Sequence, residues 1–120
     1  MRVLSIGEVR YRLLADERGG HWSARAERED GGQRFGPEIA GATEGEAIDR
    51  LIAWLSWQNE HDGALAMLQD AERAYHRTIA GSAFANPTEG PTPIELQKDA
   101  LDALEAARIR LDEVRARRPE

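Results

Sequence analysis

The spacing of apolar residues changes at Thr43, and this change constrains the fold more than any other feature of the sequence. Before Thr43, apolar and polar residues alternate, as they do in strands with one buried face. After it, apolar residues recur every three or four positions, as along one face of a helix. Thr43 and Glu46 also have the spacing of a capping box, which marks a helix start. The sequence therefore predicts an α+β fold in which a sheet precedes helices.

Three strands are predicted before Thr43. The first alternates over residues 9–14, and Gly19 and Gly20 separate it from a second strand over residues 22–27. A third strand over residues 34–39 contains Pro37, which indicates an edge or a bulge because proline cannot donate to a strand ladder. We expect a three-stranded antiparallel meander within residues 1–42.

A long helix is predicted over residues 43–81, with apolar side chains on two faces. The face expected to cover the sheet carries Ile48, Leu51, Ile52 and Leu55. The second stripe consists of Trp54, Trp57, His61, Leu65, Leu68, Ala71, Tyr75 and Ile79. This stripe keeps its phase across Asp62 and Gly63, which favours one continuous helix; a break at this dipeptide is the alternative.

A second helix is predicted over residues 93–118, after a connector over residues 82–92 that is rich in proline and glycine. Thr92, Pro93 and Glu95 have the pattern of a helix start with a capping box. The apolar stripe of this helix consists of Leu96, Ala100, Leu104, Ala107, Leu111 and Val114. Folded back antiparallel, it would cover the first helix from residue 81 to about residue 56, and residues 44–55 would then face the sheet.

Length and composition favour a single domain over residues 1–120. The 16 Lys and Arg against 22 Asp and Glu leave a net charge of −6, which disfavours nonspecific affinity for nucleic acid or anionic membranes. With no cysteine, thiol chemistry, iron–sulfur clusters and cysteine zinc sites are excluded. No stretch approaches the roughly 20 apolar residues of a membrane span, and we expect a cytoplasmic protein.

No residue pattern indicates catalysis. His61 and His76 are too far apart on a straight helix to share one metal ion, and Glu72 with His76 supplies two ligands where zinc sites use at least three. The serines lack the context of a nucleophile elbow. We therefore predict that the protein is not an enzyme and uses no cofactor or metal.

Two groups of residues are candidates for binding. The helical group, which would form a core or an interface between subunits, consists of Trp54, Trp57, His61, Tyr75 and Ile109. The sheet group, on the face away from Tyr11 and Trp22, consists of Arg10, Arg12, Arg25 and Arg34. Four arginines on one face suit a phosphate or a carboxylate, whereas the acids between them indicate an ordinary charged face with cross-strand ion pairs.

Short motifs within residues 9–57 resemble two known families. The run Gly20-His21-Trp22-Ser23-Ala24-Arg25, followed by Asp30-Gly31, Arg34, Gly36 and Thr43-Glu44-Gly45-Glu46-Ala47, resembles the AP2-like arm-binding domain of tyrosine integrases. Gly41, Thr43, Glu46 and Ala47 also resemble part of HicB-like antitoxin domains. Both families have three strands followed by a helix. The integrase resemblance implies DNA contacts by Arg12, Arg25 and Arg34, and the HicB resemblance implies a toxin partner.

The predicted function is that of a noncatalytic protein-interaction or assembly module. Its long apolar helical stripes favour a homodimer or higher oligomer, and another protein is the further partner we expect. The alternative is a DNA-binding accessory module that uses the arginine-bearing face of the sheet. No membrane partner is expected.

Overall fold

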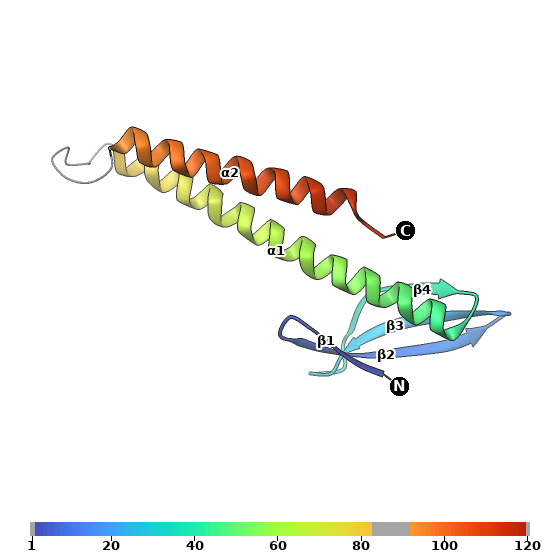
Figure 1. Ribbon diagram of the computed structural model, residues 1–120. Helices are drawn as coiled ribbons and strands as arrows, with labels where there is room; N and C mark the ends of the chain where they lie inside the picture. The colour runs from blue at the N-terminus through green and yellow to red at the C-terminus, as the bar shows by residue number, and fades with distance from the viewer. Residues whose placement is uncertain (1, 83–91, 120) are drawn as a thin grey trace. The chain divides into compact units, whose positions relative to one another are not determined.

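The computed structural model describes residues 2–82 and 92–119, and it confirms the α+β class (Figure 1). The strands are β1 (Arg2–Ile6), β2 (Val9–Arg18), β3 (His21–Arg28) and β4 (Arg34–Gly41), and the helices are α1 (Glu44–Ser82) and α2 (Pro93–Ala116). The chain divides into two compact units. One comprises Met1–Asn59 and Arg118–Glu120, and the other comprises Glu60–Arg117.

The sheet has four antiparallel strands in the order β1-β2-β3-β4, so the prediction of three strands is wrong. The additional strand, β1, pairs with β2 from Arg2 opposite Leu13 to Ile6 opposite Val9. Gly7, in the two-residue turn between them, has φ of 61°, a backbone conformation that glycine adopts without strain. Only Leu4 and Ile6 of β1 pack on the core, so five residues show too little alternation to be recognised in the sequence.

Strand β4 lies at the other edge of the sheet and is irregular, as Pro37 predicts. Ile39 pairs with Ala24 and Phe35 pairs with Ala26, so β4 carries extra residues between these two positions. Among them, Gly36 has φ of 78°, and a Cβ at this position would lie 2.5 Å from the Trp54 ring. The irregular edge therefore brings the backbone of β4 directly against a helix side chain.

The core of the first unit forms where one face of the sheet meets the start of α1. Its buried members are Tyr11, Leu13, Ala24, Ala26, Ala47, Ile48, Leu51 and Leu55. The sheet contributes side chains at every second position of β2 and β3, and α1 contributes side chains three or four residues apart. The predicted sheet-facing set is confirmed, with Ile52 partly buried at its margin.

Helix α1 begins at Glu44, one residue later than predicted, and continues through Asp62 and Gly63. The backbone N–H of Glu46 donates to the Thr43 hydroxyl at 3.1 Å, which satisfies one donor of the first turn. Arg50 donates to the carbonyl oxygen of Ala40 at 3.0 Å and joins the helix to the end of β4. Of the two alternatives for the Asp62-Gly63 dipeptide, the structure has the continuous helix.

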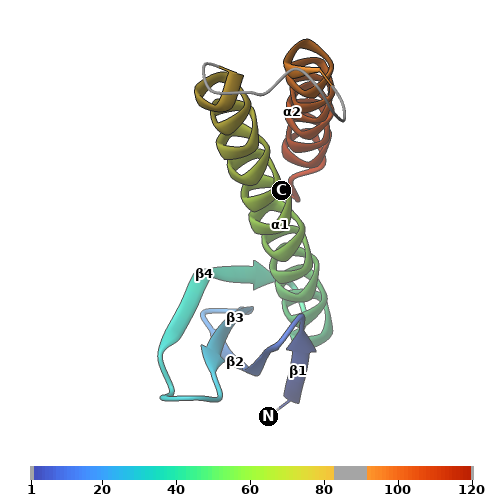
Figure 2. The same ribbon diagram turned by 90° about the vertical axis from the view of Figure 1, so that its left-hand side faces the viewer.

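In the second unit, α2 lies beside the part of α1 that begins at Glu60, and the two run in opposite directions (Figures 1 and 2). We call these two segments the helical pair. Arg117 Nη2 lies 3.5 Å from Glu60 Oε2, so the chain after α2 extends along α1 as far as Glu60. The buried side chains are Ala64 of α1 and Leu104, Ala107, Leu111 and Val114 of α2. Most of the predicted stripe of α2 thus lies inward, whereas Ala100 is partly buried and Leu96 is exposed.

Helix α2 starts with the predicted capping box. The Glu95 backbone N–H donates to Thr92 Oγ1 at 3.2 Å, and the Thr92 N–H donates to Glu95 Oε2 at 3.0 Å. Pro93 occupies the first turn, and the helix ends two residues earlier than predicted, at Ala116. Of the predicted connector, residues 83–91 lie outside the described part of the chain.

Candidate functional site

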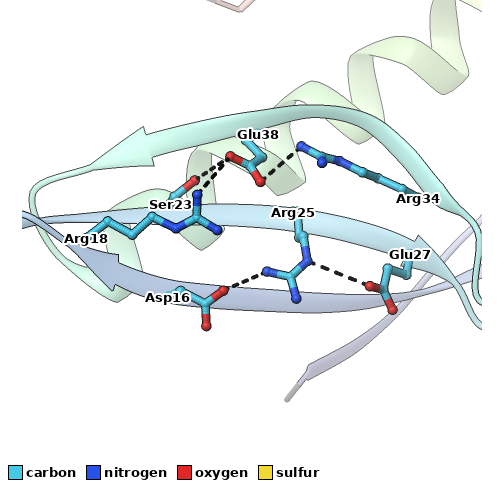
Figure 3. Close-up of polar contacts among 7 residues, drawn as sticks. All are labelled: Asp16, Arg18, Ser23, Arg25, Glu27, Arg34 and Glu38. Atoms are coloured by element: carbon cyan, nitrogen blue, oxygen red, sulfur yellow. Dashed lines mark hydrogen bonds and ion pairs between the residues drawn. The ribbon is translucent and has the colours of Figure 1, made fainter.

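One face of the sheet is polar. The strand register places alternate side chains of β2, β3 and β4 opposite the core, as the alternation predicts. The charged residues on this face that make ion pairs with one another are Asp16, Arg18, Arg25, Glu27, Arg34 and Glu38 (Figure 3). The sequence identified Arg25 and Arg34, and the structure shows what each of them contacts.

Arg25 lies at the centre of this face between two carboxylates (Figure 3). Its Nη1 donates to Asp16 Oδ2 at 2.7 Å, and its Nε lies 3.7 Å from Glu27 Oε1. The hydrogen bond to Asp16, followed by the nearby negative charges, raises the pKa of the Arg25 guanidinium. Asp16 is on β2 and Arg25 is on β3, so this contact is a cross-strand ion pair.

A second cluster surrounds Glu38 on β4 (Figure 3). Arg34 Nη2 lies 3.0 Å from Glu38 Oε1, and Arg18 Nη1 lies 3.9 Å from Glu38 Oε2. The Ser23 hydroxyl donates to the same carboxylate at 3.4 Å. Glu38 therefore draws side chains from three strands together, and Arg34 is already paired within the chain.

Arg10 and Arg12 differ in their surroundings. Arg10 Nε lies 3.2 Å from Glu29 Oε2. Arg12 makes no ion pair with any described residue, and its buried Nε lacks a hydrogen-bond partner among them. Of the four predicted anion-binding arginines, three are thus engaged by carboxylates of the chain itself, and Arg12 is the exception.

The residues of the predicted helical group are divided between the two units. Trp54 packs against the core of the first unit, where its ring centroid is 6.2 Å from that of Phe35. Trp57 belongs to the same unit, and the Arg118 guanidinium lies 5.5 Å from its ring centroid. His61 and Tyr75, in the second unit, are partly buried, whereas Ile109 is 59% exposed. Trp54 therefore has a structural role in the sheet unit.

Exposed apolar side chains concentrate on the helical pair. The described residues include seven large apolar side chains that are exposed, namely Val3, Met67, Ile79, Ile94, Leu96, Leu101 and Ile109. Six of them belong to the helical pair, and only Val3 belongs to the sheet unit. This distribution indicates that the second unit has apolar surface left uncovered.

Three of these side chains follow one line along α2. We call Ile94, Leu101 and Ile109 the α2 row; at 100° per residue they fall within an arc of about 80°. Ile94 is 78% exposed, the largest value among them. Sequence reasoning identified Ile109 alone, although the seven-residue spacing of Ile94 and Leu101 was a signal for the whole row.

The described ranges, 2–82 and 92–119, contain no group of three or more His, Asp or Glu residues that could hold a metal ion. Within the same ranges, no helix combines the length and the apolar character that crossing a bilayer requires.

Comparison with models of protein families, with curated proteins and with solved structures yields no match. The resemblances to AP2-like integrase domains and to HicB-like domains stay predictions. The geometry of the two surfaces is the basis for a functional proposal.

Proposed function

We propose that this protein is a noncatalytic interaction or assembly module that binds proteins through its helical pair. The observation that carries the proposal is the distribution of exposed apolar side chains, six of seven of which lie on the helical pair. Apolar surface of this kind on a folded unit is typical of a protein-binding site. The sheet unit, in contrast, buries its apolar face under α1.

The ion pairs of the sheet weigh against the alternative, a DNA-binding module. A carboxylate beside a guanidinium offsets its charge and occupies donors that a phosphate would use, and Arg10, Arg25 and Arg34 each have a carboxylate within 3.2 Å. Of the four predicted anion-binding arginines, Arg12 has no carboxylate partner among the described residues. The net charge of −6 also opposes the approach of a polyanion.

A binding assay with two surface variants tests the proposal. The double variant Ile94→Arg/Ile109→Arg places charge on the exposed helical surface, and Val3→Arg places charge on the sheet unit. We expect proteins retained from an extract of the native host by the unaltered chain to be lost with the helical variant and kept with Val3→Arg. Retention by the helical variant would contradict the proposal.

Binding to duplex DNA tests the alternative directly. At physiological ionic strength we expect no submicromolar binding. Affinity that falls steeply with added salt and weakens in Arg25→Ala would favour the DNA-binding module instead. The fold of Arg25→Ala is checked by circular dichroism, since this residue also makes two ion pairs.

A further inference from the structure

The α2 row does not stand alone, because two charged residues lie between its members. Lys98 lies between Ile94 and Leu101, and Glu105 lies between Leu101 and Ile109. At 100° per residue, both fall within the same arc of the helix surface as the row. Both are exposed. The exposed face of α2 therefore alternates apolar and charged side chains in the order Ile, Lys, Leu, Glu, Ile.

The order of side chains along this face is complementary to the same order on a second, antiparallel copy of the helix. If Ile94 of one chain lies opposite Ile109 of a second chain, Lys98 lies opposite Glu105, and Leu101 lies beside its counterpart. The Ile94–Ile109 pair and the Lys98–Glu105 pair share one midpoint, between Leu101 and Asp102, and Leu101 lies next to this midpoint. A two-fold axis at this point would place each apolar residue against an apolar residue and each charge against its opposite.

The charges between the members of the row set the direction of pairing. In this register, residues 93–101 of one chain lie opposite residues 102–110 of the second chain, so Lys98 faces Glu105 at both ends of the interface. A parallel pair in register would instead place Lys98 opposite Lys98 and Glu105 opposite Glu105. These two charges therefore favour an antiparallel pair.

We infer that α2 pairs with α2 of a second copy of this chain, antiparallel, with Ile94 opposite Ile109 and Lys98 opposite Glu105. This inference rests on the proposed function and names the partner of its helical surface. The buried side of α2, formed by Leu104, Ala107, Leu111 and Val114, stays against α1 in the dimer. Each chain thus keeps its own helical pair, and two pairs associate through their outer faces.

Charge reversal tests the register. Sedimentation equilibrium over a range of micromolar concentrations gives the dimer dissociation constant of the unaltered chain, of Lys98→Glu, of Glu105→Lys and of the double variant. Each single change places like charges together at both ends of the interface, and we expect the dissociation constant to rise about tenfold. The double variant restores opposite charges and should return to within about threefold of the unaltered chain.

Arg110→Glu is the matched control, because it reverses one charge of α2 about 140° away from the centre of the α2 row. It should leave the dissociation constant within about threefold. Circular dichroism of every variant shows whether the helical pair is intact. Association that persists unchanged in both single variants, or a double variant as weak as the singles, would overturn the register.

A monomeric mass of the unaltered chain at every concentration would overturn the self-association. The proposed function would survive that result if Ile94→Arg/Ile109→Arg still abolished the retention of another protein. It would fail only if the helical variant retained every partner. The two experiments therefore separate the failure of this inference from the failure of the proposed function.

Discussion

The sheet unit and the helical pair bury their apolar side chains to different degrees. Among the described residues, eight buried apolar side chains form the core of the sheet unit, and five lie in the helical pair. Exposed large apolar side chains show the opposite distribution, with one in the sheet unit and six in the helical pair. A helix packed on a four-stranded sheet encloses a hydrophobic core, whereas each of two paired helices covers only one side of the other.

This difference explains why the binding proposal concerns the helices. The polar face of the sheet is also neutralised from within, since carboxylates of the chain engage three of its four candidate arginines. A surface whose groups are already paired gains little from a ligand. The helical pair keeps both its apolar row and its alternating charges available to a partner.

The largest expected effect compares the two cores directly. Leu51→Ala should lower the free energy of unfolding by about 3 kcal/mol, because Leu51 is fully buried and its truncation would leave an enclosed cavity. Leu104→Ala, in the helical pair, should lower it by about 2 kcal/mol, because Leu104 is 4% exposed and Leu51 is 0% exposed. Urea denaturation at low protein concentration measures both. Equal losses would contradict the comparison.

The next effect tests how closely the irregular strand approaches the helix. Gly36→Ala should lower the free energy of unfolding by about 2 kcal/mol, since φ of 78° is strained for alanine and the new Cβ would meet Trp54. Gly31→Ala is the control, because its φ is 85° but no atom lies within 4 Å of the added Cβ. We expect the control to lose only about 1 kcal/mol. Similar losses in thermal denaturation would mean that the Trp54 contact is unimportant.

A smaller effect is expected at the start of α2. Thr92→Ala removes the hydroxyl that accepts the Glu95 N–H and should cost about 1 kcal/mol. Thr92→Ser keeps a hydroxyl and should melt close to the unaltered protein. The difference in melting temperature between the two variants reports the cap. A Thr92→Ser loss as large as that of Thr92→Ala would show that the threonine methyl group, and not the cap, matters.

The smallest effect is expected from the exposed ion pair between Arg25 and Asp16. A double-mutant cycle with Arg25→Ala and Asp16→Ala should give a weak favourable coupling that decreases as salt is added. Chemical denaturation at low and high salt measures it. Coupling that does not respond to salt would show that this face of the sheet is organised by more than exposed charge pairs.

Much of the fold was predictable because its signals are local. The two helix starts depend on a hydroxyl and an amide three residues apart, and both are found at Thr43 and Thr92. The two faces of the sheet follow from alternation, which correctly placed Arg25 on the polar face and Tyr11 on the opposite face. Strand β1 was missed because its place depends on pairing with β2 more than on its own five residues.

The candidate sites were less predictable, for a related reason. The sequence placed Trp54 in a helical stripe, but the bend of β4 at Gly36 brings the sheet against its ring. The same sequence shows arginines and acids interleaved on a face, but the strand register decides that Arg25 reaches Asp16, nine residues away. Which charges are paired is a property of the assembled sheet.

The sequence by itself determined that strands precede helices, where the helices start, and which sides of β2, β3 and α2 face inward, because these features depend on neighbours a few residues apart. Only the tertiary structure decided which apolar side chains stay exposed to solvent. Leu96, on the predicted inward stripe, is exposed, and Ile94, Leu101 and Ile109 form a row on another side of α2 that α1 leaves exposed. One helix can bury only one side of another, so what stays exposed depends on where the second helix lies.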